Sequence, residues 1–139
     1  MEIFRNTVYQ NSGEPAKTSM SGISESEIGP PPIYGGDPNS LNPEEMLVAS
    51  VNSCIMLVFF HFVKKYKVDV VSYHSDAEAK VEKTKNGLRF TNIKVEAKVR
   101  LANADSTQKI KEIAQLAEKY CLVSGSLACP VQYDVQVLE

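Results

Sequence analysis

The pattern of apolar and polar positions predicts two helices and several extended segments. Residues 42 to 66 begin with asparagine, proline and two acids and continue into a nearly unbroken apolar run. Asn42 suits a helix N-cap, Pro43 suits the first helical position, and acids favour the positive end of the helix dipole. We therefore expect a helix from Pro43 to about Tyr66 that needs contacts on nearly all of its sides.

A second helix is expected to start near Asp105 or Ser106, because apolar residues then recur at the helical spacing of three and four. This apolar stripe consists of Ile110, Ile113, Ala114, Ala117, Tyr120 and Cys121. Cys121 is therefore expected on the buried side of the second helix.

Alternation of apolar and polar residues indicates strands at 69–82 and 88–101, joined by a hairpin turn at 85–87, and a last strand at 130–139. In the first of these, the residues expected to share one face are Val71, Tyr73, Ser75, Ala77, Ala79 and Val81.

Two shorter strands are expected at 3–10 and 17–23, separated by the turn-like NSGEP and followed by the loop GPPPIYGGDPNS. The element order is then β-β-α-β-β-α-β, which predicts an α+β fold with one antiparallel sheet packed by two helices.

Length and composition describe a soluble globular protein. A chain of 139 residues suits one domain, 1–139, and 43% apolar residues with a net charge of −2 leave no basic excess for nucleic acid. The first residues do not resemble a secretory signal, so we expect a cytoplasmic protein. Polar residues interrupt the apolar run at 46–63, which favours a buried helix over a membrane span.

The three cysteines, Cys54, Cys121 and Cys129, are an odd number, which speaks against a structural disulfide framework. The remaining possible roles of these cysteines are reactive thiols, metal ligands or residues that simply pack in the core. Simple packing is a real alternative for Cys54, because free cysteine is among the most often buried residues. The chain has no CxxC or HxxxH pair, so we expect no zinc site.

Two motifs resemble one known family. NPEEMLVASVNSC at 42–54 is similar to the Asn-Pro-Glu segment that ends in the reactive cysteine of the OsmC/Ohr family, the osmotically inducible and organic hydroperoxide resistance proteins. CLVS at 121–124 resembles the CPVS element that carries the family's partner cysteine. Spacing, element order and length agree over about residues 35–139.

The resemblance implies an intertwined homodimer that acts as a thiol peroxidase on organic hydroperoxides. Cys54 would be the attacking thiol and Cys121 the resolving thiol, and a dithiol, either a lipoyl protein or a thioredoxin-like one, would recycle the enzyme. Such chemistry passes from thiolate through sulfenic acid to a disulfide and requires no metal or organic cofactor. Apolar residues around Cys54 suit an alkyl tail, which we expect to contact Ile55, Phe59 or Met46.

The family's activating arginine, which pairs with the glutamate matching Glu44, has no counterpart at the matching positions. Arg5 is the favoured substitute and Lys17 another, whereas Arg89 and Arg100 are expected to be solvated hairpin charges. The helix dipole is an alternative explanation of Glu44.

Glu44 also lies roughly 15 Å along the helix axis from Cys54, because ten residues separate the two. If it serves a thiol, we expect that thiol to be the other subunit's.

Other groups have simpler expected roles. His61 lies two turns from Cys54, too far to act as its base, and is expected to be packed or capped; His74 is expected at the surface. Cys129 is expected to be a passive thiol, although Cys129-Pro130 also resembles the start of CPVS and leaves it open as the resolving thiol. The alternative to an enzyme is a noncatalytic protein of the same fold that binds an apolar ligand between subunits.

Overall fold

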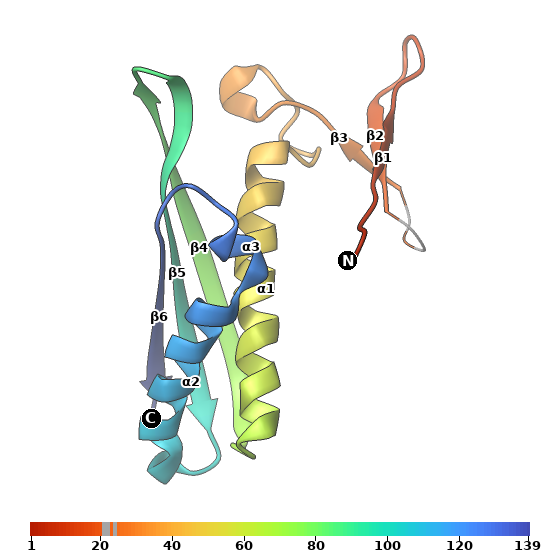
Figure 1. Cartoon of the computed structure of the whole chain (residues 1–139). Helices are drawn as coiled ribbons and strands as arrows, with labels where there is room; N and C mark the ends of the chain where they lie inside the picture. The colour runs from red at the N-terminus through yellow and green to blue at the C-terminus, as the bar shows by residue number, and fades with distance from the viewer. Residues whose placement is uncertain (21–22, 24) are drawn as a thin grey trace. The chain divides into compact units, whose positions relative to one another are not determined.

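The computed structural model describes residues 1–20, 23 and 25–139 of the chain (Figure 1). Their backbone forms two compact units, Met1–Leu47 and Val48–Glu139, which are treated separately below. The expectation of a single domain over 1–139 stays a prediction, because compactness alone does not say whether either unit folds independently.

The first unit holds a small antiparallel sheet in the order β1 (Thr7–Tyr9), β2 (Ala16–Ser19) and β3 (Ser26–Ile28). The two predicted strands exist but are shorter than 3–10 and 17–23, and positions 21 and 22 of the second lie outside the described residues. The expected turn joins them, with the Glu14 N–H donating to the Asn11 carbonyl at 3.0 Å. Strand β3 was not predicted, because three residues are too few to show an alternation.

The proline-rich loop after β3 contains a short 3-10 turn, η1 (Pro32–Tyr34), and closes on itself. The N–H of Gly36 donates to the Pro31 carbonyl at 3.1 Å, and a Cβ at Gly36 would overlap the carbonyl of Pro30. This position therefore needs glycine, and the loop is tightly folded.

Helix α1 (Pro43–Lys65) begins as predicted. The Asn42 side chain accepts a hydrogen bond from the Glu45 N–H at 2.8 Å, which is the N-cap geometry expected from the sequence. At the other end the Val68 N–H donates to the Val63 carbonyl, while Lys67 adopts a left-handed φ of 55°. This closing turn ends the helix within one residue of the predicted Tyr66.

In the second unit, β4 (Val70–Thr84) and β5 (Gly87–Leu101) form the predicted hairpin. Strand β6 (Val131–Leu138) pairs with β5, but the pairing is parallel, with Ile93 opposite Val131. The prediction of a wholly antiparallel sheet is therefore wrong for this pair. The helical crossover between β5 and β6 returns the chain to the end of the sheet where β5 begins, so the two strands run in the same direction.

That crossover consists of η2 (Ala104–Ser106), α2 (Thr107–Tyr120) and a one-turn helix α3 (Leu122–Gly125). Helix α2 and the part of α1 in this unit cover the same face of the three-stranded sheet (Figure 1). The α+β class and the order β-β-α-β-β-α-β are confirmed, with β3 and α3 as additions. The prediction of one sheet is wrong, because the strands form two separate three-stranded sheets, β1-β2-β3 and β4-β5-β6.

The core of the second unit lies between that sheet face and the helices. Helix α1 contributes one buried stripe, Val51, Ile55, Phe59 and Val63. The rest of its apolar circumference is half-buried or exposed within the described residues, and Leu57 is 63% exposed. The expected contacts on nearly all sides are therefore not made within the second unit. Helix α1 is also long and apolar enough to cross a membrane, a property that core helices of soluble proteins share.

The predicted inner face of β4 is correct in its middle and wrong at two positions. Tyr73, Ala77 and Ala79 pack against the core, but Val71 and Val81 are exposed. The register with β5 shifts beside each of these valines. Each irregularity interrupts the strict alternation of faces, so both side chains turn outward.

Candidate functional site

The thiols of Cys54 and Cys121 lie together in the second unit. Cys54 is half-buried in the middle of α1, and Cys121 is 2% exposed at the junction of α2 and α3. The two thiols are within hydrogen-bonding contact. The buried stripe of α2 is confirmed for Ile110, Ile113, Ala114 and Ala117, and it carries Cys121 against α1, whereas Tyr120 of the predicted stripe is exposed.

The segment after Cys121 folds back toward both sulfurs. Cys121 has an extended backbone between the two helices, and its Sγ accepts a hydrogen bond from the Ser124 N–H at 3.4 Å. The backbone N–H groups of Leu122 and Val123 donate to the Cys54 thiol. The first turn of α3 therefore surrounds the thiol pair with backbone donors.

The electrostatic environment of Cys54 favours its protonated form. Burial raises the pKa of the Cys54 thiol, the Val123 N–H lowers it, and contact with Cys121 raises it, so that the pKa stays above its ordinary value. Among the described residues, the side chain that acts on this thiol is Cys121, and no cation contributes to the shift. At neutral pH the chain by itself thus presents Cys54 as a thiol.

Cys129 takes a different place. It is half-buried just before β6 and packs against the edge of the core. Among the described residues, the thiol that contacts Cys54 is that of Cys121. The geometry therefore pairs Cys54 with Cys121 and leaves Cys129 outside the pair.

The apolar residues expected to contact a substrate tail are placed differently from the prediction. Ile55 and Phe59 are fully buried against the sheet and cannot reach a ligand, so that expectation is wrong for both. Leu57, one turn after Cys54, and Leu122, next to Cys121, are exposed instead. Met46 belongs to the first unit, and its expected role stays a prediction.

Glu44 lies in the first turn of α1, within the first unit. Its Oε1 is buried without a hydrogen-bond partner, and it lines a hollow of about 330 Å³ together with Pro30, Pro31 and Tyr34. A second hollow of about 400 Å³ in the same unit is lined by Asn6, Val8, Thr18, Ile28, Pro43, Met46 and Leu47. An unpartnered carboxylate oxygen in such surroundings is an incomplete site, because a buried acceptor normally has a donor.

The cations are distributed over both units. Arg5 is exposed ahead of β1, and Lys17 is half-buried in β2. Arg89 and Arg100 are exposed on β5 and donate to the carbonyls of Leu88 and Glu139, as expected of hairpin surface charges. The substitution of Arg5 for the family arginine stays a prediction.

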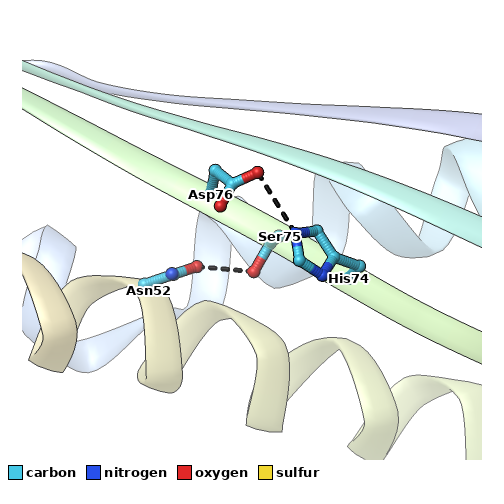
Figure 2. A network of polar contacts seen from close by, with 4 residues as sticks. All are labelled: Asn52, His74, Ser75 and Asp76. Carbon is cyan, nitrogen blue, oxygen red and sulfur yellow. Dashed lines mark hydrogen bonds and ion pairs between the residues drawn. The ribbon is translucent and has the colours of Figure 1, made fainter.

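Both histidines are at the surface. His61 is exposed and contacts the edge of the Phe62 ring at 5.1 Å between centroids, so the expectation of a packed or capped residue is wrong. His74 is exposed as predicted, with its Nε2 3.2 Å from the Asp76 carboxylate (Figure 2).

A polar network beside the thiols was not predicted. Ser75 of β4 donates to the Asn52 side chain of α1 at 2.7 Å (Figure 2), and the hydroxyls of Tyr73 and Tyr133 lie 2.7 Å apart. Ser75 also hydrogen-bonds with Tyr73. The helical turn that precedes Cys54 is thereby tied to β4 and β6. Ser75 at a core-facing position was the available signal, because a hydroxyl there needs a partner.

Comparison with known proteins agrees with this arrangement. The model of the family described as OsmC-like protein matches residues 36–136. The chain belongs to the OsmC-like family. No curated protein matches it.

Solved structures of the OsmC-like fold align with nearly the whole chain. An OsmC-like protein of unknown function from Vibrio cholerae has 22% identity and a TM-score of 0.86, covering 98% of this chain and 100% of its own. An organic hydroperoxide resistance protein from Legionella pneumophila has 16% identity and a TM-score of 0.76, covering 100% and 98%. OhrB of Bacillus subtilis has 17% identity and a TM-score of 0.65, covering 99% and 98%. At these identities the likeness establishes the fold.

Proposed function

We propose that this OsmC-like protein is a cysteine peroxidase that reduces organic hydroperoxides to alcohols in defence against oxidative stress. The contact between the thiols of Cys54 and Cys121 carries the proposal, because a peroxidatic thiol needs a second thiol in reach to avoid overoxidation. The resemblance to proteins named for organic hydroperoxide resistance supports it.

The reaction would proceed in two steps. The Cys54 thiolate attacks the distal oxygen of the hydroperoxide, the O–O bond breaks, and the alcohol leaves, so that Cys54 becomes a sulfenic acid. The Cys121 thiol then attacks that sulfur and expels water, which gives a Cys54–Cys121 disulfide. A dithiol, such as a lipoyl protein or a thioredoxin-like protein, would return both cysteines to thiols.

Activation of Cys54 would come from a homodimer. The raised pKa of the Cys54 thiol disfavours the reactive thiolate, so catalysis at neutral pH requires a cation beside it. Apolar surface on α1, including Leu57, remains uncovered within the second unit and suits burial against a second copy. We infer that a dimer brings Glu44 and a cation, with Arg5 favoured, to the partner's thiol pair.

A second candidate is a noncatalytic protein that binds an apolar ligand between subunits. The raised pKa of the Cys54 thiol favours this alternative, because a protonated thiol is a poor nucleophile. The candidates differ in turnover, since a binding protein consumes no peroxide beyond the rate of free cysteine.

Peroxide consumption distinguishes the two candidates. Cumene hydroperoxide and hydrogen peroxide are supplied separately, with dihydrolipoamide as the reductant. A peroxidase should consume the organic peroxide roughly ten- to hundredfold faster, the gain expected from removing one aromatic group from water. Cys54→Ser should abolish turnover and Cys129→Ser should leave it unchanged. Consumption no faster than that by free cysteine would support the binding protein.

A further inference from the structure

The two sulfurs of the candidate site differ in access from outside the protein. Cys121 is 2% exposed and belongs to the same buried cluster as Ile113 and Ala117. Cys54 is half-buried. An external molecule therefore meets the Cys54 sulfur first.

Backbone N–H groups can stabilise negative charge on either sulfur, and those of Leu122 and Val123 donate to the Cys54 thiol. The Sγ of Cys121 accepts a hydrogen bond from the Ser124 N–H at 3.4 Å. A donor aimed at a sulfur stabilises its thiolate, and the thiolate that is better stabilised leaves faster in disulfide exchange. Cys121 therefore has a donor of its own that would stabilise its thiolate if Cys54 is attacked.

We propose that a reductant recycles the oxidised protein by attacking the Cys54 sulfur and expelling Cys121 as the leaving thiolate, with the Ser124 N–H as its donor. This inference rests on the proposed Cys54–Cys121 disulfide. It assigns to Ser124 a positioning role, through its backbone, in the reductive half of the cycle.

A dithiol supplies both electrons for the reduction of the Cys54–Cys121 disulfide. A thiolate of the reductant forms a new S–S bond with Cys54, the Cys54–Cys121 bond breaks, and its electron pair leaves on Cys121, which then takes up a proton. The second thiolate of the reductant attacks the reductant's own sulfur in the mixed disulfide. The reductant ends as a cyclic disulfide, and Cys54 is released as a thiolate.

Attack at Cys121 would require a different motion. The thiolate must approach the attacked sulfur in line with the bond that breaks, and Cys121 is enclosed by core residues. A reductant would reach it only if α2 or α3 opened first. The two routes thus predict different mixed disulfides.

The decisive experiment identifies which cysteine receives the reductant in the wild-type chain. Diamide forms the disulfide without using peroxide, so the result does not depend on peroxidase activity. Diamide is removed, glutathione, a monothiol, is added for a short time, and excess N-ethylmaleimide then stops the reaction and captures the thiol that was released. Peptide mapping should find glutathione on Cys54 and maleimide on Cys121, with at least a tenfold excess over the reverse assignment.

Equal labelling, the reverse assignment, or failure of diamide to join Cys54 to Cys121 would overturn the inference. Selective labelling in a protein that consumes no peroxide would instead refute the proposed peroxidase and leave the redox assignment intact.

Two variants test the leaving group. Ser124→Pro removes the backbone donor, whereas Ser124→Ala keeps it and serves as the matched control. Reduction of the disulfide by dihydrolipoamide should slow about tenfold in the proline variant, as expected for loss of a hydrogen bond to a charged group, and should be unchanged in the alanine variant. Circular dichroism checks the fold of both. Equal rates in two folded variants would remove the role of the Ser124 N–H.

Discussion

The hydroxyl groups of Tyr73 and Tyr133 lie 2.7 Å apart and join two strands that are not neighbours in the sheet. Both strands pair with β5, and the two side chains meet beside Phe59 of α1. Through Phe59, the helix that carries Cys54 packs on this tyrosine pair.

Tyr133 should make stability depend on pH in the alkaline range. Burial and the contact with Tyr73 raise the pKa of Tyr133, so the folded state holds a proton that the unfolded state loses above about pH 10. Its contribution is complete below about pH 10 and is lost as pH rises, by about 1.4 kcal/mol for each further unit. Urea unfolding at pH 8 and pH 11 should show this loss, and Tyr133→Phe should reduce it, leaving the contribution of Tyr73, whose pKa is also raised by burial.

Tyr34→Phe provides the matched control, because Tyr34 is 54% exposed on a loop. It should change neither the urea midpoint nor the dependence of the midpoint on pH. An undiminished alkaline loss in Tyr133→Phe would contradict the assignment to Tyr133.

The hydrogen bond between Ser75 and Asn52 should contribute to the free energy of unfolding as a coupled pair. Ser75→Ala leaves the Asn52 oxygen without its donor, Asn52→Ala leaves the Ser75 hydroxyl without its acceptor, and the double variant removes both. The cycle should give a coupling of about 0.5–1.5 kcal/mol. Ser72→Ala, at an exposed position of the same strand, should change stability little. A coupling of zero would mean that the bond is not maintained in solution.

The reaction of Cys54 with an alkyl hydroperoxide should accelerate with pH. Its raised pKa means that the thiolate fraction grows about tenfold per unit from pH 6 to pH 8.5 and does not saturate in that range. Single-turnover rates of Cys129→Ser, which keeps Cys54 and Cys121 as the thiol pair, measure this directly. A plateau at or below pH 7 would show that a cation of the assembled protein lowers the pKa of the Cys54 thiol.

Leu57→Glu should weaken the proposed homodimer. Each copy would lose the burial of one large apolar side chain, about 1.5–3 kcal/mol, so the dissociation constant should rise about 100-fold or more. Leu88→Glu is the matched control, because it makes the same substitution at the exposed tip of the β4–β5 hairpin. Sedimentation at micromolar concentration distinguishes the species. A wild-type chain that sediments as a folded monomer would refute the dimer.

The sequence was most informative where local signals act over a few residues. The cap at Asn42, the turn at Gly87 and the helical stripe that ends in Cys121 all depend on neighbours along the chain. These signals predicted α1, the hairpin and α2. The motifs alone brought Cys54 and Cys121 together as a hypothesis, and the geometry places their thiols in contact.

Features that depend on the path of the chain could not be predicted in this way. Alternation along β6 indicates which side chains face the core but not the direction of the strand, so its parallel pairing was missed. The outward turns of Val71 and Val81 follow from register shifts that no apolar pattern marks. The network of Asn52, Ser75 and Tyr133 joins residues far apart in sequence and emerges only in three dimensions.

The parallel position of β6 beside β5 has a consequence for synthesis on the ribosome. The sheet of the second unit cannot be completed until the last residues of the chain have emerged. Cys54 emerges first, and Cys121 follows about 70 residues later, which takes roughly 3 to 14 s at the usual speed of translation. If Cys54 is the proposed peroxidatic thiol, a nascent Cys54 oxidised in that interval would have no Cys121 with which to form a disulfide and would proceed toward sulfinic acid. Under the proposed mechanism, the newly made chain would therefore be more vulnerable to peroxide than the finished protein.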